Sequence, residues 1–262
     1  MFIYLAVAAD FWRGARTTVS EHSLKLHSTM IALGLAIHGW LLYLDIFGTD
    51  FGSGFNLGFF NALSLIFWLT VLVYWVANLK HQLQSLQAFV LPPAALFALL
   101  PALTVTNHFI PESIQPIFMA HIGIALIAYS LFTFAALHAL LMTIAERSLH
   151  NKPTLINLPS FPPLMVMEGL LFRVITLGFV LLTITLISGM FFSEQLYGKP
   201  LEFTHKIVFS IASWLIYGWL LFGRYQYGWR GKKAINLTLI GFVLLLLAYV
   251  GSKFILQVLL GR

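Results

Sequence analysis

The chain has 262 residues, of which 60% are hydrophobic and only 9% are charged. Its mean hydropathy of +0.89 is typical of a helical protein that crosses a membrane several times, and it excludes a water-soluble enzyme. Because the chain contains no cysteine, disulfides, thiolate metal ligands and covalent attachment of haem to this chain are excluded as well.

Long apolar runs follow one another along the chain and predict an all-α polytopic membrane protein. A first stretch, residues 1–11, reaches only about half of a bilayer crossing and predicts a short helix. Its positive charges follow the apolar residues, which argues against a signal peptide. Seven longer runs predict seven spans, so that the chain has seven or eight transmembrane helices in a single integral membrane domain, 1–262. The seven runs are 26–47, 57–79, 88–105, 117–144, 170–192, 207–222 and 237–260.

The connections between these runs alternate in charge. Lys and Arg gather after the short first run and after the second, fourth and sixth full runs. By the positive-inside rule these basic connections face the cytoplasm, while 48–56, 106–116 and 193–204 face the other side. The pattern predicts a multi-pass membrane protein in the lipid bilayer. It also explains the formal net charge of +6 without nucleic-acid binding.

Several of the nine histidines lie inside or at the ends of apolar runs. An ionisable ring in hydrocarbon is costly, and imidazole is the side chain best suited to hold haem iron. His121 lies about two turns inside the external end of its run, and His205 begins its run at the same external level. We therefore predict His121 and His205 as axial ligands of haem iron. His38, in the middle of its run, is a third cofactor-binding candidate at a deeper level.

A purely structural role for these histidines stays open. A lone imidazole in a membrane protein often only forms a hydrogen bond with a carbonyl or hydroxyl group on a neighbouring helix, and we favour that interpretation for His138. His27 and His38 share one helical face, but eleven positions separate them by about 16 Å, so one haem cannot use both.

The second half of the chain resembles a known family. Residues 168–192 read EGLLFRVITLGFVLLTITLISGMFF, 204–224 read THKIVFSIASWLIYGWLLFGR, and 227–251 read YGWRGKKAINLTLIGFVLLLLAYVG. These segments resemble the cytochrome c assembly protein family, which includes CcsA, CcmC and CcmF, and most closely its smaller YpjD and HemX branch, with a family-like core at about 115–260. AHIGIALIAYSLF at 120–132 is similar to the stretch that carries the first external haem-ligand histidine of CcsA-type proteins, which implies that role for His121.

Two family features are missing. CcsA-type proteins carry a tryptophan-rich haem loop, whereas the external stretch here reads EQLYGKPLEFTHK, and the chain end SKFILQVLLGR has no histidine. The assignment of His205 therefore rests on its position alone, as does the pairing of Lys199 and Lys206 with haem propionates. The resemblance implies a protein of the bacterial inner (cytoplasmic) membrane that binds haem b non-covalently near the outer face and assists assembly of cytochrome c or another haem protein, without synthase activity.

A function of another class remains open. A HemX-like regulatory or scaffold protein would bind no cofactor and would control tetrapyrrole synthesis through a partner. The surface that binds the partner would be formed by the cytoplasmic connections 147–168 and 224–233. The expected partners are thus haem and cytochrome c maturation proteins, or else tetrapyrrole-synthesis proteins. A small-solute transporter is disfavoured because paired broken helices and inverted halves are not evident; the prolines at 92, 93 and 101 are expected to break one span at most.

Overall fold

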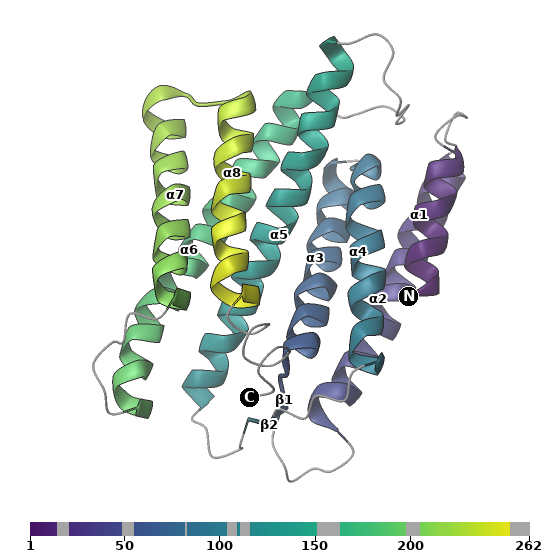
Figure 1. The fold of residues 1–262 in the computed structure, drawn as a ribbon. Coiled ribbons are helices and arrows are strands. Elements are labelled where there is room, and N and C mark those ends of the chain that lie inside the picture. Colours follow the sequence, from purple (N-terminus) through teal and green to yellow (C-terminus); the bar gives the residue numbers. More distant parts are fainter. Residues whose placement is uncertain are drawn as a thin grey trace. The chain divides into compact units, whose positions relative to one another are not determined.

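The computed structural model is almost entirely helical and describes residues 1–14, 21–48, 55–81, 83–103, 109–110, 116–150, 163–197 and 205–251 (Figure 1). Within these residues the elements follow in chain order: α1 (Phe2–Gly14), α2 (Glu21–Phe47), β1 (Phe55–Asn56), α3 (Phe59–His81), α4 (Gln84–Leu103), β2 (Phe109–Ile110), α5 (Pro116–His150), α6 (Leu164–Tyr197), α7 (His205–Tyr227), α8 (Gly231–Leu246) and a π-helical turn η1 (Leu247–Gly251). The two short strands pair antiparallel.

The seven predicted spans are confirmed. Helices α2 to α8, with η1 completing α8, are each long and apolar enough to cross a membrane, and α1 is a shorter apolar helix, as its composition predicts. α4 runs continuously through Pro92, Pro93 and Pro101. Proline is tolerated in a transmembrane helix because neighbouring groups re-satisfy the backbone carbonyls that it leaves unbonded.

The predicted starts of two spans were wrong. α6 begins at Leu164 and not at residue 170, and α8 begins at Gly231 and not at residue 237. The expected end of the last span, 252–260, lies outside the described residues. The first turn of α8 tolerates charge because the Lys233 ammonium lies 3.3 Å from the centre of the Trp229 ring. Such a cation–π contact places the charge at the membrane surface while the apolar stem follows the helix.

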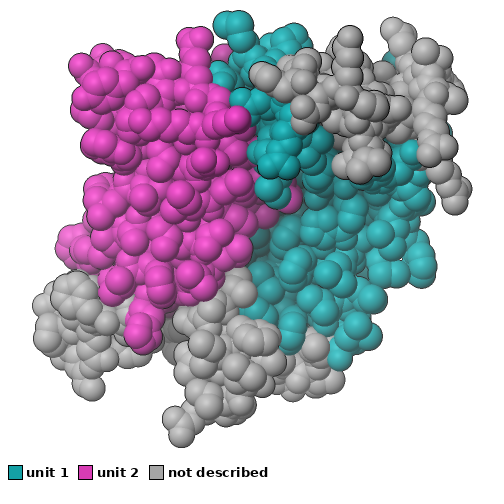
Figure 2. All heavy atoms as spheres, turned by 45° about the horizontal axis from the view of Figure 1, so that its top comes forward, with its two compact units in different colours: residues 1–111, 140–169 teal, residues 112–139, 170–262 magenta. Residues whose placement is uncertain are grey.

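The chain forms two compact units (Figure 2). Unit 1 comprises residues 1–111 and 140–169, and unit 2 comprises 112–139 and 170–262. In unit 1, α3 packs on α4 and α2, and α1 packs on α4 and α2. In unit 2, α7 packs on α8 and η1. The expectation of a single integral membrane domain over 1–262 stays a prediction.

Aromatic stacking and buried hydrogen bonds hold unit 2 together. The Phe132 and Tyr217 rings stack with centroids 4.0 Å apart, which joins α5 to α7. Ser213 Oγ donates a hydrogen bond to the carbonyl of Gly241 over 2.8 Å, which joins α7 to α8. Trp214 Nε1 donates to Thr183 Oγ1 over 2.8 Å, which joins α7 to α6. Polar groups in hydrocarbon need partners within the protein, so these bonds fix how the helices face one another.

The two ends of unit 2 differ in charge, which predicts its orientation. Arg224, Arg230, Lys232 and Lys233 lie where α7 ends and α8 begins, while α5 and α7 both start at the other end (Figure 1). The positive-inside rule places the basic end in the cytoplasm.

Because the chain has no cysteine, single cysteines test this orientation on a clean background. In spheroplasts, a membrane-impermeant maleimide is expected to label Ser113→Cys, which lies in the sequence before α5, outside the described residues. Gln226→Cys, near the end of α7, should react only after lysis. The reverse labelling pattern would overturn the assignment of sides.

Candidate functional site

Two of the three predicted ligand histidines lie at one end of unit 2. His121 lies in the second turn of α5, and His205 is the first residue of α7. The last turns of α6 reach the same end (Figure 1). This end carries the external connections predicted from the charge pattern, so the two histidines share both a unit and a side.

A serine on α6 orients the imidazole of His121. His121 Nδ1 and Ser188 Oγ are 2.7 Å apart. Ser188 Oγ also donates to the carbonyl of Ile184 over 2.7 Å, with the carbonyl of Thr185 at 3.2 Å. A hydroxyl has one proton, and when Ser188 donates it to the Ile184 carbonyl, His121 Nδ1–H is the donor to Ser188. This network assigns the neutral ring a lone pair on Nε2, the form in which histidine binds metals.

The surroundings of His121 leave the ring half-buried. The Phe118 ring lies one turn before it, with centroids 6.0 Å apart and planes 21° from parallel. A Cβ atom at Gly189 would lie 3.4 Å from His121 Cε1, so glycine keeps this side of the imidazole clear of a side chain. Lys206, on α7, interacts electrostatically with His121. A cationic group near a candidate ligand suits an anionic substituent such as a carboxylate.

His205 is placed differently from His121. Its side chain is exposed, and within the described part of the chain no hydrogen bond or ring contact is found for it. The structure thus brings His121 and His205 to one end of unit 2 without joining their rings. Among the residues that the structure describes, no three metal-ligating side chains gather around one point. The arrangement is that of two separate imidazoles and not of a closed metal cage.

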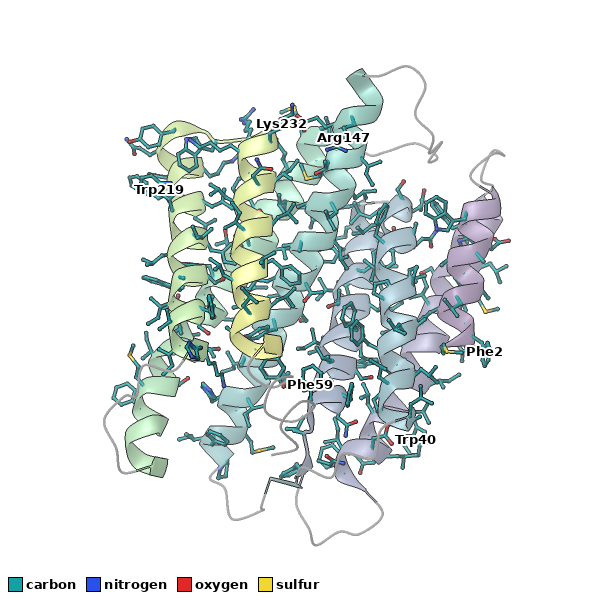
Figure 3. The ribbon with its side chains drawn as sticks, viewed as in Figure 1. Phe2, Trp40, Phe59, Arg147, Trp219 and Lys232 are labelled. Atoms are coloured by element: carbon teal, nitrogen blue, oxygen red, sulfur yellow. The ribbon has the colours of Figure 1, made fainter. Side chains whose placement is uncertain are left out.

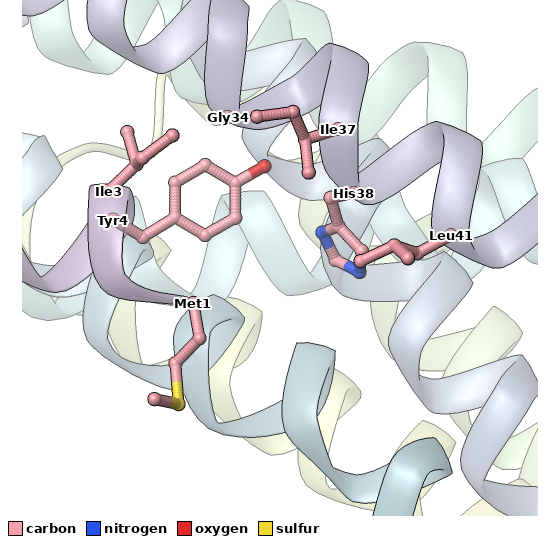
Figure 4. Close-up of a pocket in the computed structure, with 7 residues that line it drawn as sticks. All are labelled: Met1, Ile3, Tyr4, Gly34, Ile37, His38 and Leu41. Atoms are coloured by element: carbon pink, nitrogen blue, oxygen red, sulfur yellow. The ribbon is translucent and has the colours of Figure 1, made fainter.

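His38 lies in unit 1, where it is buried and satisfied on one side only. Its Nε2 is 3.0 Å from Ser64 Oγ on α3. The ring meets Tyr4 of α1 edge to face, with centroids 5.9 Å apart. Beside it lies a pocket of about 30 Å³ (Figure 4). A porphyrin-sized ligand needs several hundred Å³, so this pocket does not fit haem.

The contacts of His27 and His138 fit a structural role. His27 Nε2 lies 2.8 Å from Asp10 Oδ2, an ion pair that ties α2 to α1. This pair could not be predicted from the sequence, because the residues are seventeen positions apart on different helices. His138 is fully buried, and its ring lies parallel to that of Phe134. His108 and Lys199, and the side chains of His22 and His150, lie outside the described residues.

Comparison with known proteins decides the family. A family model described as "Cytochrome C assembly protein" matches residues 26–260. The chain belongs to the cytochrome c assembly protein family. It is 34% identical to Inner membrane protein YpjD of Escherichia coli over 213 residues, which is 79% of this chain and 78% of that protein.

More distant family members are also similar. Cytochrome c biogenesis protein CcsA of Prochlorococcus marinus is 36% identical over 89 residues, 34% of this chain and 28% of that protein. CcsA of Guillardia theta is 25% identical over 152 residues, 52% of this chain and 50% of that protein. These findings confirm the resemblance seen in the sequence and its YpjD branch. With seven apolar spans, the chain is a multi-pass inner-membrane protein of this family.

Removing the Ser188 hydroxyl should release the imidazole of His121. We expect Ser188→Ala to change the ring from the single Nδ1–H form to a mixture of tautomers, because the acceptor for that proton is lost. The measurement is the nitrogen spectrum of the protein labelled with ¹⁵N-histidine, with the His121 signals assigned by their loss in His121→Gln. Figure 3 draws the side chains of the described residues as sticks on the ribbon.

Thr176→Val is the matched control, since Thr176 also donates to a carbonyl of its own helix, that of Phe172, but lies three turns from Ser188. An unchanged His121 spectrum in Ser188→Ala would contradict the assignment.

Proposed function

We propose that this protein binds haem b non-covalently at the outer end of unit 2 and handles it for the assembly of cytochrome c or another haem protein. His121 is one axial ligand and His205 the second. The observation that carries the proposal is the hydrogen bond from His121 Nδ1 to Ser188, which leaves the Nε2 lone pair as the coordinating atom.

The chain's own residues hold and orient the cofactor. Ser188 sets the tautomer and direction of the His121 ring, and Gly189 leaves room beside it. Lys206 supplies a positive charge close to His121, suited to a propionate. His205 is exposed and so has the freedom to turn toward a ligand. When bound, haem supplies the iron and its redox chemistry, while the protein supplies position and access.

His38 enters the proposal only as a deeper position for haem. In this structure Tyr4 of α1 covers the His38 ring, and the pocket beside it is too small for a porphyrin. Haem reaches His38 only in a conformation in which α1 has moved away. The two-histidine site of unit 2 does not depend on this movement.

Membership of the family supports the partners that we propose for this protein. The relatives named CcsA are described as cytochrome c biogenesis proteins, so haem and the proteins of cytochrome c maturation are the proposed partners here. The alternative is a scaffold that controls tetrapyrrole synthesis from its cytoplasmic side. That function would use the basic connection between α7 and α8 rather than the histidines.

The test is the optical spectrum of detergent-purified protein from haem-supplied cells, oxidised and then reduced with dithionite. We expect a low-spin b-type spectrum, because two neutral imidazoles give a strong ligand field. His121→Ala and His205→Ala should each abolish or shift the Soret band. His81→Ala, a half-buried histidine at the end of α3 in the other unit, should leave it unchanged.

Unchanged spectra in both ligand variants would overturn the ligand assignment. A colourless wild-type protein would contradict haem binding and favour the scaffold. In that case charge reversals at Lys232 and Lys233 should impair function more than the histidine substitutions do.

A further inference from the structure

The pocket between α1 and α2 contains two buried polar atoms that the described chain leaves without a hydrogen-bond partner. They are the hydroxyl oxygen of Tyr4 and Nδ1 of His38. The side chains are almost completely buried, with exposed fractions of 1% and 4%. Buried polar atoms in folded proteins nearly always have a partner, and in hydrocarbon the cost of lacking one is especially high.

Both atoms face the same small space. Tyr4 and His38 both line the pocket of about 30 Å³, and Figure 4 shows the Tyr4 hydroxyl and the His38 ring directed toward one another across it. A volume of about 10–15 Å³ is enough for one water molecule, so the pocket admits one or two. Of the other lining residues, Ile3, Gly34, Ile37 and Leu41 are apolar, while Met1 brings its amino group, which interacts electrostatically with His38.

We propose that this pocket is a binding site for a water molecule that bridges Tyr4 and His38. The bound molecule completes a polar chain from Tyr4 through His38 to Ser64, and it links α1 to α2 and α3 inside the apolar interior of unit 1. The small volume excludes larger ligands, and a water molecule can both accept and donate hydrogen bonds to the polar atoms of the pocket. The site is separate from the proposed haem ligands of unit 2.

The hydrogen-bond directions follow from Ser64. Its side chain is 1% exposed, and its hydroxyl makes its hydrogen bond in the described chain with His38 Nε2. Because His38 is the hydrogen-bond partner of the Ser64 hydroxyl, the proposal has Ser64 donate to Nε2 and places the His38 proton on Nδ1. His38 therefore donates from Nδ1 into the pocket, and water can accept that bond and also bond to Tyr4. His38 and His121 thus carry their protons on the same atom for different reasons: Ser64 donates to His38 Nε2, and Ser188 accepts from His121 Nδ1.

The backbone of α2 is shaped for this contact. A Cβ atom at Gly34 would lie 2.7 Å from Tyr4 Cε1, so only glycine lets the ring lie this close to the helix. Farther along α1, Asp10 pairs with His27. The short helix α1 is therefore fixed to α2 at two levels, by the water-bridged Tyr4 and by the ion pair.

Tyr4→Phe tests the bridge, with Tyr74→Phe as the matched control. Tyr74 is also fully buried in unit 1, and its hydroxyl also lacks a protein partner, but it does not line the pocket. Removing a hydroxyl that bonds to water should lower the thermal midpoint by about 2–4 °C. Tyr74→Phe should leave the midpoint unchanged or raise it. Equal effects of the two substitutions would overturn the proposal.

A second measurement uses the wild-type chain and does not depend on how the variants fold. In protein labelled with ¹⁵N-histidine, His38 should show its proton on Nδ1, and Ser64→Ala should remove this preference. A wild-type His38 with its proton on Nε2 would overturn the proposal. The haem spectrum of Tyr4→Phe should equal that of the wild type, so failure of the water site and failure of the haem proposal are distinguishable.

Discussion

The lipid surroundings impose the constraint on which the rest of this structure depends: a polar group in a span is costly to leave without a hydrogen-bond partner, because lipid offers none. Hydroxyl groups of Thr70, Thr133 and Thr176 meet it by donating to carbonyls of their own helices. Histidines meet it across helices: His27 with Asp10, His38 with Ser64 and His121 with Ser188. The same bonds that satisfy these rings therefore also set their orientation and their protonated nitrogen.

The two histidine–serine pairs show how this constraint leads to different chemistry. Ser188 Oγ lies within hydrogen-bond distance of a carbonyl of its own helix as well as of His121 Nδ1, and Nε2 is the atom that the proposal assigns to the iron. Ser64 donates to His38 Nε2, and that nitrogen is thereby occupied. The ring of His121 is also the more accessible of the two, since His121 is half-buried near a helix end, whereas His38 is buried against Tyr4. Unit 2 thus holds the proposed iron ligand, and unit 1 holds a buried histidine beside a small pocket.

Much of the fold could be predicted from the sequence, because the length and composition of apolar runs determine which segments span a membrane. The same patterns, with the family resemblance, singled out His121. The start of α8 was mispredicted because a lysine in the first turn is stabilised by Trp229, a contact that depends on the turn geometry. Ser188 was missed because it lies 67 positions from His121 and looks like any small residue of a span. Pairings between helices depend on packing, which one sequence does not reveal.

The central claim is that His121 Nε2 binds haem iron at the outer end of unit 2. Chemical rescue of the missing imidazole tests this claim most directly. His121→Gly removes the imidazole, and free imidazole added to the purified variant can take its place. The account predicts loss of the low-spin signal in the electron paramagnetic resonance spectrum of the ferric variant and its return on addition of imidazole. A low-spin signal in His121→Gly that equals that of the wild type before imidazole is added would contradict the claim.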